Sequence, residues 1–263
     1  MTKRVAVLGT PITHSLSPAL HRAAYEELGL DWSYEAIEVS ANQVCEFVTG
    51  CGPEWAGLSL TMPLKEAVLP ALSQRTPVVE LTQAANTVVF DGQSRSGHNT
   101  DVSGFVNALH EINVVAVGAV TLLGSGATAR SALVAMHEMG AHAITVVART
   151  GTSAQRLVEL AELLNVQCEV LDWTSDRAKS DVLGAELVIN TAPADVAATL
   201  AGNGQGLLFD AIYNPWPTPL ASGWAGTIVS GHDLLIHQAL GQIALMTGYV
   251  VDVDVLRGAL PGS

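Results

Sequence analysis

Short apolar runs alternate along the whole chain with segments in which apolar residues recur every three or four positions. The runs predict buried strands, and the segments predict amphipathic helices. In the first part of the sequence we expect strands at 4–8, 32–39, 57–60, 87–90 and 94–98, and helices at 41–48, 66–72 and 102–110, with a further helix opening at Pro18. An Asp-Gly pair at 91–92 predicts a hairpin turn between the last two strands.

The same alternation continues in the second part of the sequence. An apolar run at 114–123 precedes a helical pattern at 131–139; further strands are expected at 144–147, 168–171, 187–190 and 207–210, and helices at 153–164, 234–246 and 253–260. Strands that alternate with helices in this way predict an α/β fold. A length of 263 residues is comfortable for two modest domains.

A glycine-rich turn separates the apolar run at 114–123 from the helical pattern after it. A strand, a G-x-G-x-x-[GA] turn and a helix in this order are typical of a dinucleotide site. Gly124 allows the tight turn, Gly126 lets the backbone approach a pyrophosphate, and Ala129 lets the helix pack closely on the strand. The helix N-terminus then offers unpaired N–H groups to the phosphates. A glycine turn that binds no ligand is the alternative.

The residues after the next predicted strand indicate which dinucleotide is bound. An NAD enzyme usually places an acidic residue about 20 residues past the glycines, but residues 141–158 contain none. Arg149 stands there instead, and a guanidinium suits the 2′-phosphate of NADP. We therefore expect NADP as the cofactor.

The composition argues against several other classes of protein. The chain is 49% hydrophobic and 14% charged, which provides a large core, and its net charge of −13 disfavours a nucleic-acid or anionic-membrane partner. Residues 5–9 are too short an apolar stretch for a signal peptide, and no run approaches a membrane span. Three cysteines without a C-x-x-C pattern suit a reducing cytoplasm, and eight histidines without H-x-x-x-H predict no metal.

One lysine lies where ligands bind in open α/β sheets. Lys65 is one of three lysines in the chain, and it stands where a strand ends and a helix begins. There it could give a proton as an ammonium group or take one as an amine. A surface lysine whose stem covers apolar neighbours is the alternative.

Several neutral and acidic side chains stand at other predicted strand ends and helix starts. Ser17 and Asp101 can each cap a helix, which would be a sufficient structural role. Capping does not account for Ser15, Asn86 or Asn99, whose polar groups suit hydroxyls or a carboxylate of a ligand.

Six short motifs, in order and with plausible spacings, resemble the shikimate dehydrogenase family over nearly the whole chain. They are S-x-S at 15–17, T-x-P-x-K at 61–65, A-N-T at 85–87, N-T-D-x-x-G at 99–104, D-x-x-Y-x-P at 210–215, and a late glycine and glutamine element at 231–238. The resemblance implies an oxidoreductase that reversibly reduces 3-dehydroshikimate to shikimate with NADP(H). This reaction belongs to the cytoplasmic shikimate pathway, which leads through chorismate to the aromatic amino acids.

The resemblance also implies roles for individual residues. Lys65 and Asp101 are implied to be the catalytic pair. The residues implied to surround the substrate are Ser15, Ser17, Thr61, Asn86, Asp101, Tyr213 and Gln238. The residues implied to bind the cofactor are Gly124, Ser125, Gly126, Ala127, Thr128, Ala148, Arg149, Thr150, Ile212 and Gly231.

The implied architecture has two domains. Residues 1–104 form an N-terminal α/β substrate domain, residues 105–237 form a Rossmann-type NADP-binding domain, and C-terminal helices at 238–263 return to the first domain. The implied partner is shikimate or 3-dehydroshikimate, bound by a monomer or homodimer that binds neither nucleic acid nor a membrane.

Some positions depart from the family's pattern. Ser59 stands where many members have asparagine, Ala148 replaces the amide of an N-R-T element, and Ser153 stands where a second basic residue often follows. The 2′-phosphate would then be held by Arg149 and Thr150 alone, which predicts a preference for NADP rather than strict selectivity. Two alternatives are a quinate/shikimate dehydrogenase that uses NAD and a catalytically idle NADP-binding regulator.

Overall fold

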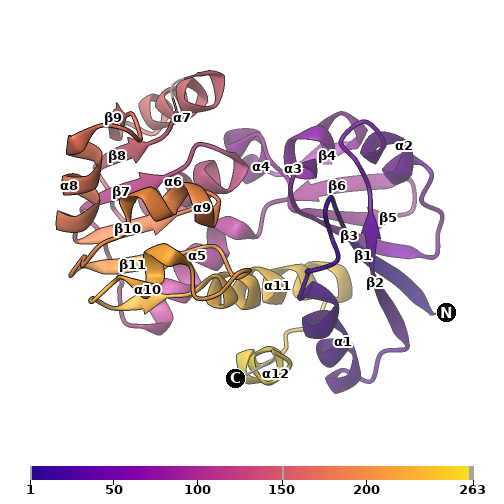
Figure 1. Cartoon of the computed structure of the whole chain (residues 1–263). Coiled ribbons are helices and arrows are strands. Elements are labelled where there is room, and N and C mark those ends of the chain that lie inside the picture. Colours follow the sequence, from indigo (N-terminus) through magenta and orange to yellow (C-terminus); the bar gives the residue numbers. More distant parts are fainter. Residues whose placement is uncertain (1, 150, 261–263) are drawn as a thin grey trace. The chain divides into compact units, whose positions relative to one another are not determined.

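The computed structural model describes residues 2–149 and 151–260. It divides into two compact units (Figure 1). The first unit comprises Met1–Gly104 and Leu235–Ser263, and the second comprises Phe105–Leu234. The chain thus returns to the first unit at residue 235, three residues before the expected position 238.

The first unit is a six-stranded sheet with helices. Its elements are β1 (Lys3–Gly9), α1 (Ser17–Glu27), β2 (Trp32–Glu38), α2 (Val44–Thr49), β3 (Trp55–Leu60), α3 (Leu64–Ala67), the 3-10 helix η1 (Leu69–Ala71), β4 (Gln74–Arg75), α4 (Pro77–Thr82), β5 (Thr87–Asp91), β6 (Ser94–His98) and α12 (Val253–Gly258). The helices α5 (Asp101–Glu111) and α11 (Gly231–Thr247) each begin in one unit and end in the other.

The strand order of the first sheet, β2-β1-β3-β5-β6-β4, brings several chain segments to one edge. β1 runs parallel to β2 and β3, whereas β5 runs antiparallel to β3 and β6. In this register Thr87, the first residue of β5, pairs with both Ser59 and His98. The carboxyl ends of β1, β3 and β6 and the start of β5 therefore lie together.

The two faces of the first sheet carry separate cores, because successive side chains of a strand point to opposite faces. Ala6 and Leu8 belong to one core, which also holds side chains from α2 and α3. Val5 and Val7 belong to the other core, which holds side chains from α1, β2 and α11. This packing fixes α11 against the sheet and so determines where its polar side chains lie.

The second unit is a six-stranded parallel sheet with helices. Its other elements are β7 (Ala119–Leu123), α6 (Ala127–Glu138), β8 (Ala143–Val147), α7 (Thr152–Leu163), β9 (Gln167–Leu171), α8 (Asp176–Gly184), β10 (Leu187–Asn190), α9 (Ala194–Ala197), the 3-10 helix η2 (Ala198–Leu200), β11 (Leu207–Asp210), α10 (Pro219–Ser222) and β12 (Ile228–Val229). The strand order is β9-β8-β7-β10-β11-β12. This is the order of a Rossmann fold, and it reverses between β7 and β10, where such folds bind their ligands.

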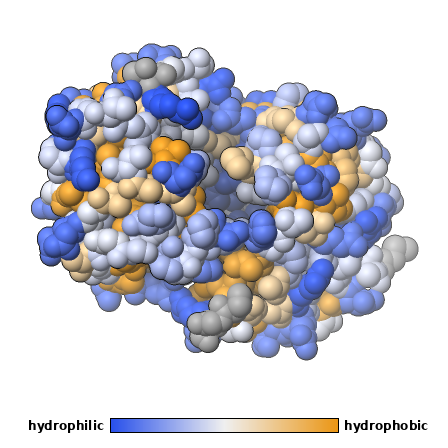
Figure 2. All heavy atoms as spheres, in the orientation of Figure 1, coloured by the Kyte–Doolittle hydropathy of each residue, from blue (hydrophilic) through white to orange (hydrophobic). Residues whose placement is uncertain are grey.

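In the second unit, a buried core includes Leu123, Val188 and Leu208, from β7, β10 and β11. On the face drawn in Figure 2, hydrophilic residues surround smaller groups of hydrophobic ones on each unit. Among the residues that the structure describes, no helix has both the length and the apolar character needed to cross a membrane.

Two capping predictions for helices of the first unit are wrong. The N-cap of α1 is Leu16 rather than Ser17, which is the first residue of the helix, and Ser15 Oγ instead accepts the backbone N–H of Ser17 at 3.4 Å. Asp101 is likewise the first residue of α5, and Asn99 Oδ1 accepts its backbone N–H at 3.1 Å. In both cases a residue two positions earlier satisfies the first free N–H group, which leaves the predicted cap free for another role.

Candidate active site

Lys65 and Asp101 form an ion pair in the first unit. Lys65 Nζ lies 2.6 Å from Asp101 Oδ2, and the two side chains are only 13% and 5% exposed. Lys65 reaches this position because β3 ends at Leu60 and the short helix α3, which follows Pro63, carries Lys65 just beyond the strand end. Its backbone carbonyl also accepts the N–H of Ala85 at 2.8 Å. The alternative interpretation, a surface lysine whose stem covers apolar neighbours, is therefore wrong.

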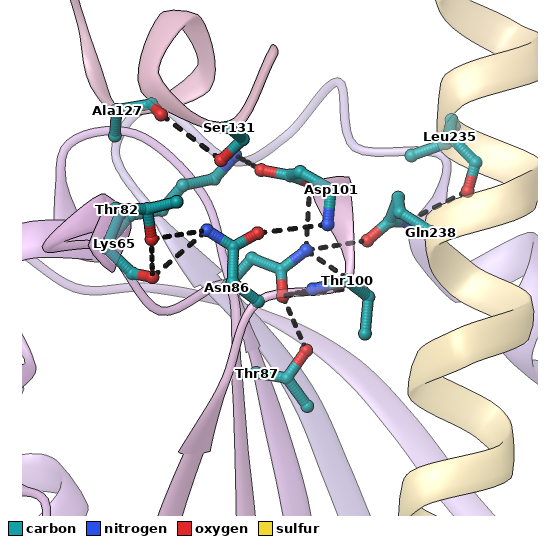
Figure 3. A network of polar contacts seen from close by, with 12 residues as sticks. Lys65, Thr82, Asn86, Thr87, Thr100, Asp101, Ala127, Ser131, Leu235 and Gln238 are labelled. Carbon is teal, nitrogen blue, oxygen red and sulfur yellow. Dashed lines mark hydrogen bonds and ion pairs between the residues drawn. The ribbon is translucent and has the colours of Figure 1, made fainter. Parts of the chain in front are cut away.

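Asn86 joins this pair to the helix α11 (Figure 3). Its Nδ2 donates to Asp101 Oδ1 at 2.8 Å, to Thr100 Oγ1 at 2.9 Å and to Gln238 Oε1 at 3.4 Å. Gln238 in turn donates to the backbone carbonyl of Leu235 at 2.9 Å. The structure thus brings together four of the predicted site residues, Lys65, Asn86, Asp101 and Gln238.

Asn99, two residues before α5, holds the backbone of Asp101 in place. Asn99 Nδ2 donates to Thr82 Oγ1 and to the carbonyl of Ala84, each at 3.1 Å, while its Oδ1 accepts the N–H of Asp101. Asn99 is 8% exposed, so these bonds form away from solvent. The sequence suggested a ligand as the partner of Asn99, whereas in the structure its amide bonds Thr82, Ala84 and the start of α5.

Three predicted substrate residues lie in segments that follow β1 and β3. Ser15 and Ser17 belong to the segment after β1, and Thr61 comes directly after β3. The backbone N–H of Thr61 donates to the carbonyl of Leu8 at 2.9 Å, which ties the ends of the two parallel strands together. These side chains thus belong to the same edge of the sheet as Asn86, and their contact with substrate stays a prediction.

The glycine-rich turn in the second unit follows β7, at the point where the strand order reverses. Gly124 has a φ of +100°, and a Cβ added there would lie 2.7 Å from Thr191 Oγ1, so both backbone and packing require glycine. At Gly126, the N-cap of α6, an added Cβ would meet no protein atom within 4 Å. Protein packing therefore gives no reason for glycine at 126, whereas a pyrophosphate against this backbone would.

Arg149, the residue expected to bind the 2′-phosphate, lies close to this turn in the sequence of contacts. The N–H of Gly124 donates to the carbonyl of Val147 at 3.0 Å, and Arg149 follows two residues later with an exposed side chain. The side chain of Ala148 is buried, and its N–H donates to the carbonyl of Leu171. Thr150 lies outside the described residues. The chemistry of the exposed guanidinium and of the open glycine turn fits a dinucleotide phosphate.

A buried carboxylate organises the segment after β11. Asp210 accepts hydrogen bonds from Asn190 Nδ2 at 2.8 Å, from Thr218 Oγ1 at 2.5 Å and from the N–H of Ile212 at 3.2 Å. Burial raises the pKa of Asp210, and these donors act in the opposite direction. They hold both ends of the loop that carries the predicted residues Ile212 and Tyr213.

The remaining predicted residue of this region, Gly231, has a structural reason to be glycine. An added Cβ would lie 2.6 Å from the carbonyl carbon of Ile212. Beside it, the ring of Tyr213 lies 5.9 Å from that of His232. The roles of Ser125, Ala127, Thr128, Ile212 and Gly231 in cofactor binding stay predictions. Among the described residues, no group of three or more histidine, cysteine or acidic side chains is placed to hold a metal ion.

Comparison with known proteins relates both units to one kind of enzyme. Residues 7–88 match the family model described as the shikimate dehydrogenase substrate binding domain. A relative named shikimate dehydrogenase (NADP(+)) from Methanothermobacter thermautotrophicus is 33% identical, over 98% of this chain and 96% of that protein. The structure of Mycobacterium tuberculosis shikimate dehydrogenase is 41% identical, with a TM-score of 0.88 and 98% of each chain covered. A structure of Thermus thermophilus shikimate 5-dehydrogenase in complex with NADP(H) and shikimate is 29% identical, with a TM-score of 0.82 and 98% of each chain covered.

Proposed function

The chain belongs to the shikimate dehydrogenase family, and we propose that it catalyses the reversible, NADP-dependent reduction of 3-dehydroshikimate to shikimate. This oxidoreductase reaction is a step in the biosynthesis of the aromatic amino acids. The observation that carries the proposal is the ion pair of Lys65 and Asp101, because a shielded lysine held by a carboxylate is suited to acid–base catalysis.

Lys65 serves as the general acid in reduction and as the general base in oxidation. When bound, NADPH supplies the hydride that reduces the carbonyl carbon. Lys65 gives a proton to the alkoxide oxygen that develops, and it takes the proton back in the reverse reaction. Acid–base assistance of this kind contributes about 10²–10⁴-fold to the rate. Asp101 holds the ammonium group by the 2.6 Å contact and accepts a hydrogen bond from a hydroxyl of the substrate.

Neutral hydrogen-bonding groups around this pair orient the substrate. Hydroxyls and amides can bind the hydroxyls and the carboxylate of shikimate without introducing another charge. We assign this role to Ser15, Ser17, Thr61, Asn86, Tyr213 and Gln238. In this assignment the first unit is the substrate-binding unit, except for Tyr213, which belongs to the second unit.

The second unit binds NADP in our proposal. Gly124 and Gly126 shape the turn for the pyrophosphate, and the N-terminus of α6 offers it the positive end of the helix dipole. Arg149 binds the 2′-phosphate through charge-assisted hydrogen bonds. A cytoplasmic location is proposed because all three cysteines are free thiols. The enzyme acts as a monomer or a homodimer, which sedimentation equilibrium distinguishes.

Initial rates with two substrates and two cofactors test this function. Shikimate and quinate are each oxidised with NADP and with NAD at fixed ionic strength, and shikimate with NADP is expected to give the highest kcat/KM. Comparable rates with quinate and NAD would instead support a quinate/shikimate dehydrogenase. Tight NADP binding without turnover of either substrate would support an idle regulator.

A further inference from the structure

The side-chain amide of Gln242, on α11, can lie in only one orientation. Its Nε2 is 3.1 Å from the backbone carbonyl oxygen of Asn86, a group that only accepts hydrogen bonds. A flipped amide would bring two acceptor oxygens together there. Gln242 Nε2 therefore donates to Asn86 and, with its second proton, to Thr87 Oγ1 at 3.1 Å. Its Oε1 faces the opposite direction and accepts hydrogen bonds.

The hydrogen bonds beyond Gln242 are fixed in the same way. Asn86 Oδ1 accepts the backbone N–H of Thr100 at 2.9 Å, so Asn86 Nδ2 is the atom that faces Asp101. The Thr87 hydroxyl lies between Gln242 Nε2, which can only donate, and Asn86 Oδ1, which can only accept and lies 2.7 Å away. The Thr87 proton therefore points to Asn86.

Behind Gln242, two side chains donate to its Oε1. The Ser59 hydroxyl does so at 2.8 Å and His21 Nε2 at 3.2 Å. Because the Ser59 proton points to Gln242, the Tyr34 hydroxyl, 2.8 Å from Ser59 Oγ, donates to Ser59. Burial lowers the pKa of His21 to about 3, so this histidine is neutral with its proton on Nε2, and its Nδ1 accepts from Tyr25 at 3.2 Å.

We propose that Gln242, supported by Ser59, is a positioning residue for the catalytic pair. It is the central link of a one-directional chain of hydrogen bonds that runs from one donor to the next and ends on the Asp101 carboxylate: Tyr34, Ser59, Gln242, Thr87, Asn86 and Asp101. The proposal rests on the proposed function, because it concerns the roles assigned there to Lys65 and Asp101.

Because this series of hydrogen bonds is buried, the loss of one bond weakens the next. The six residues are between 0% and 4% exposed, so bulk water cannot take the place of a lost donor. Donors that all point the same way polarise one another in such surroundings. Asn86 holds Oδ1 of Asp101 while Lys65 holds Oδ2, so a weaker hydrogen bond from Asn86 would let the carboxylate shift and displace the oxygen that orients Lys65.

The test replaces Gln242 by a side chain of similar size without hydrogen-bonding groups. Gln242→Met is expected to lower kcat for shikimate oxidation by about tenfold per folded molecule, while the shikimate dissociation constant, measured by calorimetry, changes by less than about threefold. Ser59→Ala, a milder variant, is expected to lower kcat by about two- to threefold. In the double variant the Ser59→Ala effect should disappear, because the chain is already interrupted at Gln242.

A control in the same helix separates positioning from stability. Thr247→Val removes a hydrogen bond to the carbonyl of Ile243 and is expected to lower the melting temperature without changing kcat. The proposal is overturned if Gln242→Met and Ser59→Ala also lose only stability and keep wild-type kcat, or if their effects on kcat are independent. Wild-type enzyme that fails to oxidise shikimate would refute the proposed function itself, whereas active wild type with unaffected variants refutes only this inference.

Discussion

Lys65 and Asp101 are 36 residues apart in the sequence, and their charged groups meet at 2.6 Å, with the lysine side chain largely and the aspartate side chain almost fully shielded from solvent. The contact depends on the antiparallel strands β5 and β6, which return the chain to the edge where β3 ends. A surface ion pair contributes little to stability. In our proposal this shielded pair instead serves proton transfer.

Asp101→Asn is expected to lower kcat by at least about tenfold while the protein stays folded. Both carboxylate oxygens accept hydrogen bonds, from Asn86 and from Lys65, so an amide NH₂ at either place would face another donor. The start of α5 is retained because Asn99 still accepts the backbone N–H of residue 101. Circular dichroism and kcat per folded molecule check this. Normal kcat in a variant of reduced stability would show that Asp101 is only structural.

The glycine turn offers a matched pair of substitutions. Gly124→Ala is expected to destabilise the fold by about 1–3 kcal/mol, because of the positive φ and the close approach of Thr191. Gly126→Ala, which has open space around it, is expected to leave the unfolding free energy nearly unchanged and to weaken NADP binding by at least about tenfold. Denaturant unfolding and calorimetry measure the two effects. Unchanged NADP affinity in Gly126→Ala would remove the argument that the pyrophosphate lies there.

Arg149→Ala is expected to reduce the preference for NADP. Charge-assisted hydrogen bonds contribute about 1.5–3 kcal/mol each, so the loss corresponds to about one to two decades of NADP affinity. NAD lacks the 2′-phosphate, and its binding should hardly change. The ratio of kcat/KM for NADP over NAD, at fixed salt, measures this in both proteins. An equal ratio in wild type and variant would mean that Arg149 does not contact the phosphate.

The buried His21 predicts how stability depends on pH. Its pKa is about 3 in the folded protein and 6.5 in the reference state, because burial disfavours the charged form. The unfolded chain therefore takes up the proton first as the pH falls. The contribution of His21 is fully present above about pH 6.5 and is lost at up to about 1.4 kcal/mol per pH unit on the way to pH 3.

His21→Phe isolates this contribution, because it keeps a ring against Tyr34, whose ring lies 4.1 Å from that of His21. The difference in unfolding free energy between wild type and variant, measured by urea unfolding at several pH values, should shrink as the pH falls from about 6.5 to 4.5. The absolute stability of the variant at neutral pH is expected to be lower, because Tyr25 and Gln242 lose a partner. Parallel pH curves would show that His21 does not resist protonation.

The sequence predicted those features that a repeating pattern or a motif carries. The strands at 187–190 and 207–210 match β10 and β11, and the Asp-Gly turn joins β5 to β6. Lys65, Asn86 and Asp101, which come from three separate motifs, lie in one hydrogen-bonded group. The α/β class follows from the same alternation of strands and helices.

The features that the sequence did not predict depend on tertiary contacts. β4 has two residues, too few to show a period, and the folded backbone decided that Ser15 and Asn99, rather than Ser17 and Asp101, accept the first N–H groups of α1 and α5. Gln242 belongs to no motif, and only the packing of α11 on the sheet places its amide between Ser59 and Thr87. A pattern along one helix does not reveal which strand that helix will contact.

The most direct test of the proposed mechanism is kcat for shikimate oxidation with NADP in wild type, in Lys65→Ala and in the control Lys179→Ala, whose lysine is exposed on α8. We predict that Lys65→Ala lowers kcat by about 10²–10⁴-fold and changes the shikimate dissociation constant by less than about tenfold, with Lys179→Ala unaffected. A Lys65→Ala enzyme with nearly normal kcat would contradict the assignment of the proton transfer to Lys65.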